Sequence, residues 1–180
     1  KRQVYDRVLR FEERDKLMKI LYYVYLLDVY MAVANVAKER GFVFAKAHPN
    51  DKNTLVMKGM FHPFLTKPVG NTIAVDENSN VIFLTGANMA GKSTFMKSFG
   101  ITVFLAHVGF PVPAKEMEFS VQNGMFTTIN LPDNLSMGYS HFYAEVLRVK
   151  KVAQQVRQTQ HLIVVFDELF RGTNVKDAYD

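Results

Sequence analysis

Charged residues and then a long apolar stretch occupy the first quarter of the chain, whose composition is that of a helix. From about residue 4 to residue 40 there is no Gly or Pro, and most residues are good helix formers. Gly41 follows as a natural C-terminal cap, so the segment predicts one long helix or two. Its first third is highly charged and its second part is apolar. We therefore expect it to enter from solvent or from another domain and to end packed against the core.

After Gly41 the pattern changes to short β-prone runs at residues 42–44, 54–57 and 71–75, which predict a strand-rich flank. The apolar runs 81–85 and 162–166 are continuous, as expected for strands covered on both faces in a parallel sheet. Residues 124–129 predict a further strand.

Two helices are predicted in the second half of the chain, one from residue 92 to about 107 and one from 140 to about 158. Gly109 and Pro111 end the first of them. Strands and helices in this order predict an α/β fold, with a mostly parallel sheet and covering helices. We place a domain junction near Gly41, between a helical connector segment, 1–40, and one domain, 41–180.

Composition narrows the possible functions only slightly. The chain has 180 residues, 48% of them apolar, enough for one core, and its net charge of +5 is compatible with nucleic acid but mild. The absence of Cys excludes disulfides, thiolate metal sites and a cysteine nucleophile, and fits a cytosolic protein. The chain starts at Lys1 without Met and stops at Asp180, so we expect an excised fragment.

One segment, residues 20–34, is apolar except for Asp28 and invites comparison with a membrane span. It is shorter than the ~20 residues that a bilayer needs, and a charge in the middle of a span is costly. We therefore favour a helix buried between neighbours over a span, and we expect no membrane partner.

The clearest chemical motif is G-x-x-x-x-G-K-[ST], placed between an apolar run and a predicted helix. Its glycines allow successive backbone N–H groups to point at phosphate oxygens, and the helix start adds its positive end. Lys92 is expected to reach the β- and γ-phosphates, and the Ser93 hydroxyl to bind Mg²⁺. The alternative is a Gly-rich turn with an incidental Lys-Ser pair. The predicted cradle comprises Gly86, Ala87, Asn88, Met89, Ala90, Gly91, Lys92, Ser93 and Thr94.

A second motif completes this predicted P-loop NTPase site. The apolar run 162–166 ends in Asp167 and Glu168, which we assign to the magnesium and to the attacking water, respectively. Taken alone, this pair is also compatible with an acidic turn at a strand end.

Several motifs together resemble the ATPase domain of the MutS DNA mismatch-repair family over residues 59–180. They are T-G-A-N-M-A-G-K-S-T at 85–94, A-H-V-G at 106–109, D-N-L-S-M-G-Y-S at 133–140, and D-E through R-G-T at 167–173. The family's usual cradle reads T-G-P-N-M-G-G-K-S-T, so Ala87 and Ala90 replace a Pro and a Gly. The resemblance implies an ABC-type P-loop ATPase that binds ATP and Mg²⁺ in the cytoplasm, associated with the nucleoid.

The resemblance also implies homodimers with composite ATP sites, in which the Ser140 hydroxyl points across the interface at the γ-phosphate; within one chain it is only a helix cap. Asn88 resembles the family Asn near phosphate, or else is a turn residue. Val69 and Ile73 are the candidates beside adenine, because the expected aromatic residue after Pro68 is missing. His141 replaces the family's usual Thr, and we favour a solvent-facing position for it.

Residues 1–40 then correspond to the end of a helical lever that joins DNA-binding parts to the ATPase. DNA is accordingly expected to bind through parts outside this chain, and the family's switch His and dimerisation segment to lie beyond Asp180. The F-E-E sequence at 11–13 matches a mismatch-reading wedge in letters only.

The leading hypothesis is a mismatch-repair ATPase with Lys92, Ser140 and Glu168 as catalytic groups. A MutS paralogue that acts on branched or recombination DNA is the alternative. Another ABC-type ATPase is disfavoured, because the L-S-G-G-Q type signature is absent.

Overall fold

The computed structural model describes residues 2–7, 13–129 and 141–169. The chain divides into two compact units, Lys1–Gly41 and Phe42–Asp180, each of which is described by itself.

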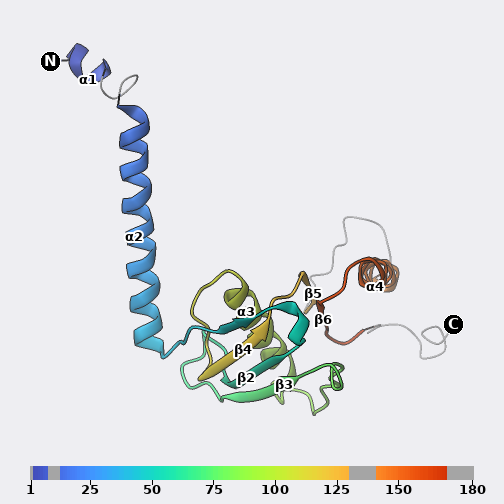
Figure 1. The fold of residues 1–180 in the computed structure, drawn as a ribbon. Helices are drawn as coiled ribbons and strands as arrows, with labels where there is room; N and C mark the ends of the chain where they lie inside the picture. Colours follow the sequence, from blue (N-terminus) through green and yellow to red (C-terminus); the bar gives the residue numbers. More distant parts are fainter. Residues whose placement is uncertain (1, 8–12, 130–140, 170–180) are drawn as a thin grey trace. The chain divides into compact units, whose positions relative to one another are not determined.

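The first unit is helical (Figure 1). It contains α1, Arg2–Arg7, and the longer α2, Arg14–Arg40. The predicted cap is confirmed, because Gly41 has a left-handed backbone, with φ of 69°, and its N–H donates to the carbonyl of Ala37. A side chain is strained at such a φ, which explains why Gly ends the helix here.

Helix α2 has no buried residue along its length, all of which the structure describes. By length and composition alone it could cross a membrane, although the core helix of a soluble protein passes the same test. The helix is also longer than the 15-residue apolar run at its centre, so the argument from length against a span is weakened, while the argument from Asp28 stands. Packing of α2 against the core remains a prediction.

A four-stranded mixed sheet forms the main body of the second unit (Figure 1). Its order is β1-β4-β2-β3, with β1·β4 parallel and the β2·β4 and β2·β3 pairs antiparallel. A short 3₁₀ helix, Asn50–Lys52, follows the first strand. The strands are β1, Lys46–His48; β2, Leu55–Met60; β3, Asn71–Val75; and β4, Glu116–Ser120.

Alternation along the central strands places the hydrophobic core on one face of this sheet. In β4, Met117 and Phe119 are buried while Glu116 and Glu118 point outward, the period of two expected for a half-buried strand. Helix α3, Lys92–His107, supplies the other side of the core through Phe99 and Val103. The core also contains Leu55, Met57, Met60, Ala106, Val112 and Ala114.

A separate parallel pair carries the carboxylates of the predicted site. Strand β5, Gly124–Thr128, runs beside β6, Leu162–Phe166, and α4, His141–Gln158, precedes β6 in the chain. Strand β5 comes close to α3, because a Cβ added to Gly100 would lie 4.0 Å from the Thr127 methyl group. The described strands therefore form two sheets, the larger one mixed, where the sequence predicted one mostly parallel sheet.

The prediction for residues 81–85 was wrong. They form no strand, and their side chains are exposed, Phe83 at 88% and Val81 at 71%. An apolar run becomes a strand only when a neighbour accepts its backbone hydrogen bonds, and no described strand pairs with this one. Residues 42–44 likewise contribute only an isolated bridge, between Val43 and Val112.

Candidate functional site

The loop before α3 has the tight backbone that its sequence predicts. Met89 and Gly91 have positive φ angles of 64° and 93°, and the N–H of Ala90 donates to the Ala87 carbonyl at 3.1 Å. The first helical hydrogen bond of α3 follows directly, from the Phe95 N–H to the Gly91 carbonyl at 2.9 Å. The loop therefore leads straight into a helix start, where unpaired N–H groups and the helix dipole favour an anion.

The Lys92 ammonium group lies against the carbonyls of this loop. Its Nζ donates to the carbonyl oxygens of Gly86 at 2.7 Å and of Ala87 at 3.0 Å. These contacts hold a positive charge at the mouth of the cradle, where a phosphate oxygen would replace a carbonyl as hydrogen-bond acceptor.

Two predicted ligands 74 positions apart are in direct contact. The Ser93 hydroxyl donates to Oδ2 of Asp167 at 3.0 Å, in a half-buried environment. Asp167 follows β6, and its backbone N–H donates to the Thr128 carbonyl at 3.1 Å, which extends the β5·β6 ladder by one bond. The pairing of β5 with β6 thus fixes the position of the Asp167 backbone, and with it the contact of this carboxylate with the start of α3.

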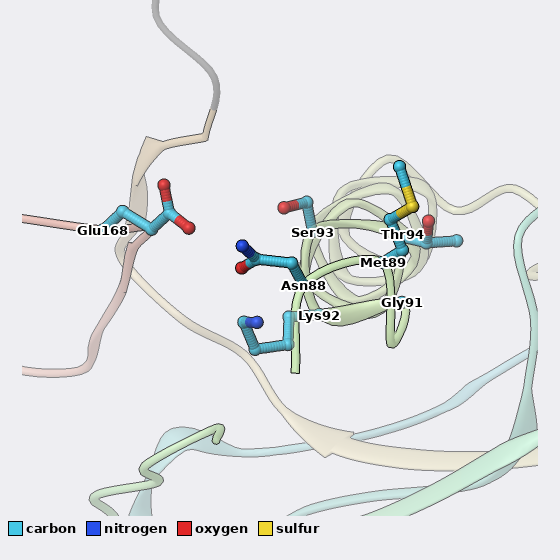
Figure 2. Close-up of a pocket in the computed structure, with 7 residues that line it drawn as sticks. All are labelled: Asn88, Met89, Gly91, Lys92, Ser93, Thr94 and Glu168. Atoms are coloured by element: carbon cyan, nitrogen blue, oxygen red, sulfur yellow. The ribbon is translucent and has the colours of Figure 1, made fainter. Parts of the chain in front are cut away.

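An open pocket of about 210 Å³ joins the loop to the end of β6. In Figure 2 the side chains of Asn88, Lys92 and Ser93 point toward the side from which Glu168 approaches. The volume is below the ~300 Å³ at which complete small-molecule sites begin, which suits the phosphates of a nucleotide better than the whole molecule. The lining consists of Asn88, Met89, Gly91, Lys92, Ser93, Thr94 and Glu168.

Three of the lining residues have a left-handed backbone. Besides Met89 and Gly91, Glu168 has a φ of 44°. A non-Gly residue in this region costs on the order of 1–3 kcal/mol, and such strain concentrates at functional sites. The local conformation of both the loop and the acidic turn is therefore consistent with a site rather than with an incidental turn.

Other predicted site residues have different positions. Gly86, Ala87 and Ala90 belong to the loop but not to the pocket lining. Neither adenine candidate lines the pocket, since Val69 is 78% exposed and Ile73 packs on the core. Ser140, the rest of the 133–140 motif and the R-G-T sequence at 171–173 lie outside the described residues, and His141 is the first residue of α4.

The sequence did not indicate the part played by Thr128. This residue is buried, receives the Asp167 N–H on its carbonyl, and directs its hydroxyl to the Val165 carbonyl at 3.5 Å. A Thr at the end of a β-prone run carries no distinctive signal, because its contact depends on the pairing register of β5 with β6.

Two exposed side chains on the four-stranded sheet, Glu118 and Lys58, have shifted pKa values. The pKa of the Glu118 carboxyl group is lowered, first by the hydrogen bond from His48 and then by the charge of Lys46. The pKa of Lys58 is raised by its hydrogen bond to Glu116, 2.6 Å away, and by the charge of that carboxylate. Within each of these exposed ion pairs the positive and negative charges compensate one another.

A loop with Lys and Ser at a helix start, facing two consecutive carboxylates at a strand end, defines a candidate phosphate-binding site. Residues 82–180 match the family model for MutS domain V. The chain is 33% identical over 158 residues to the DNA mismatch repair protein MutS of Geobacillus sp. (strain WCH70). The aligned segment covers 84% of this chain and 18% of that protein. It is 31% identical over 183 residues to the protein of the same name from Persephonella marina, covering 97% of this chain and 21% of that protein. The chain belongs to the MutS family, and it spans about a fifth of the length of these relatives.

Proposed function

We propose that this chain is the ATP-binding and ATP-hydrolysing part of a MutS-type DNA mismatch repair protein, with the P-loop NTPase fold that its motifs predict. The contact between Ser93 and Asp167 carries the proposal, because it joins the two motifs across 74 positions. Lys92 and Glu168 line the same pocket from the same two segments. If the two motif matches were unrelated, there would be no reason for the loop and the acidic strand end to be in contact.

The donor set suits Mg²⁺. The Ser93 hydroxyl and the Asp167 carboxylate are hard oxygen ligands, and they already lie 3.0 Å apart. Within the described residues no group of three or more His, Cys, Asp or Glu could hold a metal ion. Mg²⁺ at nucleotide sites usually takes one or two protein oxygens and completes its shell with phosphates and water, so a complete protein cage is not needed.

The residues of the pocket divide the proposed reaction among them. Lys92 leaves the carbonyls of Gly86 and Ala87 and donates instead to phosphate oxygens. The N–H groups at the start of α3 hold the same phosphates. Glu168 orients a water molecule and accepts its proton as the water oxygen bonds to the γ-phosphorus and the bond from that phosphorus to the bridging oxygen breaks, so that ADP and phosphate leave. Mg²⁺, when bound, neutralises charge that develops on the phosphates.

In the intact protein we propose a homodimer in which ATP binding is coupled to DNA. The relatives are named DNA mismatch repair proteins, which supports mismatched DNA as the substrate. Ser140 is then the residue that completes the partner's site, ATP binding closes the dimer, and hydrolysis reopens it. We propose a cytoplasmic location for this protein.

The alternative substrate is branched or recombination DNA, handled by a MutS paralogue without mismatch reading. ATPase assays with perfect, mismatched and branched duplexes distinguish the two. Stimulation by the mismatched duplex supports the first reading, and stimulation by the branched duplex alone supports the second.

Binding of a fluorescent ATP analogue tests the site itself. Lys92→Ala should weaken binding at least tenfold, because a charge-assisted contact to phosphate is worth about 1.5–3 kcal/mol. Lys97→Ala, which removes an exposed Lys from the same helix, is the matched control and should bind as the unaltered chain does. Equal affinities for the Lys92 variant and the control would remove the cradle from its assigned role.

A further inference from the structure

Helix α4 has two distinct sides. Its packed side includes Val152, which is buried, and the half-buried Val149 and Gln155. With 3.6 residues per turn, the opposite side carries Lys150, Gln154, Arg157 and Gln158, and Lys151 borders it. The structure exposes all five of these residues, which we call the basic face of α4.

The basic face lacks the acidic residues that neutralise other parts of the molecule. Helix α4 contains four basic residues and a single acidic one, Glu145, and no Asp or Glu occurs from residue 146 to residue 166. Across the described ranges 2–7, 13–129 and 141–169, no carboxylate forms an ion pair with Lys150, Lys151 or Arg157. On the four-stranded sheet, by contrast, each Lys in a cross-strand position pairs with a Glu.

We propose that the basic face of α4 binds the phosphate backbone of duplex DNA. Lys150 and Arg157 are seven residues apart, which separates their charges by roughly 10 Å along the helix, so that they meet different phosphates. Gln154 and Gln158 lie between and beside them and supply amide donors, the side-chain type that accompanies Lys and Arg at DNA backbones. Such contacts hold DNA without reading its sequence.

A membrane surface fits this face less well. A helix that lies in a membrane needs a free apolar side to insert, whereas the side of α4 opposite the basic face is occupied, with Val152 only 5% exposed and Val149 half-buried. The relatives are named DNA mismatch repair proteins, which supports DNA rather than lipid as the bound polyanion. The inference adds a DNA contact inside the chain to the proposed function, and it requires no nucleotide at the pocket.

The test is the salt dependence of DNA binding by the full chain, measured without nucleotide by anisotropy of a labelled, fully paired duplex. The variant replaces Lys150, Lys151 and Arg157 with Gln, which keeps the helix and removes three charges. The matched control replaces Lys52, Lys67 and Lys115 with Gln, which makes the same change of net charge at exposed positions elsewhere. Circular dichroism confirms that both variants keep their helix content.

Each phosphate contact contributes about 0.9 to the slope of log K against log salt. The α4 variant should therefore lower that slope by about 2 to 3 between about 50 and 200 mM salt, and the control should lower it by less than about 1. Equal slopes for the two variants would mean that net charge alone matters, and the proposal would fail. Unchanged DNA binding combined with lost binding to anionic lipid vesicles would also overturn it, in favour of a membrane. Because no nucleotide is present, neither result bears on the ATP site.

Discussion

The hydrogen bond between Ser93 and Asp167 permits a quantitative test of how the two halves of the site are joined. The Ser93 hydroxyl donates to the Asp167 carboxylate at 3.0 Å. A hydrogen bond to a charged group contributes about 1.5–3 kcal/mol when shielded from water. Both side chains are half-buried, so we expect a contribution of about 1 kcal/mol to the free energy of unfolding.

The measurement is a double-mutant cycle with Ser93→Ala, Asp167→Ala and the combined variant, each unfolded in urea with a chelator present. With a slope of about 2 kcal/mol per molar urea, losing the bond moves the unfolding midpoint by about 0.5 M. The combined variant should lose about 1 kcal/mol less than the sum of the single variants. Losses that add to within about 0.3 kcal/mol would show that the two residues do not interact, and the link between loop and strand would have to be sought elsewhere.

Two other predictions concern single carboxylates. Glu168→Gln in the intact protein should keep ATP binding, while the rate of ATP turnover falls by a factor of about 10² to 10⁴. Turnover is measured as phosphate release, with ATP binding as the control. Normal turnover would remove Glu168 from its role. The lowered pKa of Glu118 means that its ion pairs add stability above the ordinary pKa of 4.5, and that this contribution is lost as the pH falls through the lowered value. The melting temperatures of the unaltered chain and of Glu118→Gln should therefore differ at neutral pH and converge in acid, whereas a constant difference would contradict this origin.

Much of the fold could be predicted where local signals were strong. The predicted helix at residues 92–107 and the strands at 71–75 and 162–166 are confirmed with the bounds that the structure gives. Each of these segments combines a clear periodicity or apolar run with turn residues at its ends. The cap at Gly41 is confirmed for the same reason, since its left-handed backbone is a local property.

The failures depended on partners that a sequence does not display. Residues 81–84 are as apolar as strand β6, yet only β6 has a described neighbour to complete its backbone hydrogen bonds. Strands β1 and β4, more than 60 positions apart, pair in a sheet that no local pattern predicts. The site followed the same rule: motif letters predicted Lys92, Ser93 and Asp167, while the contribution of Thr128 depends on register.

Helix α3 has a consequence for genetics. The same helix carries Lys92 and Ser93 at its start and, about three turns later, the fully buried Thr102 and Val103. A substitution that disturbs the packing of Val103 would tilt the helix and so displace its first residues. A random screen for loss of nucleotide binding should therefore return alleles in the interior of the protein as well as in the loop. Measuring the thermal stability of each allele would separate the two kinds, since only interior alleles should melt early.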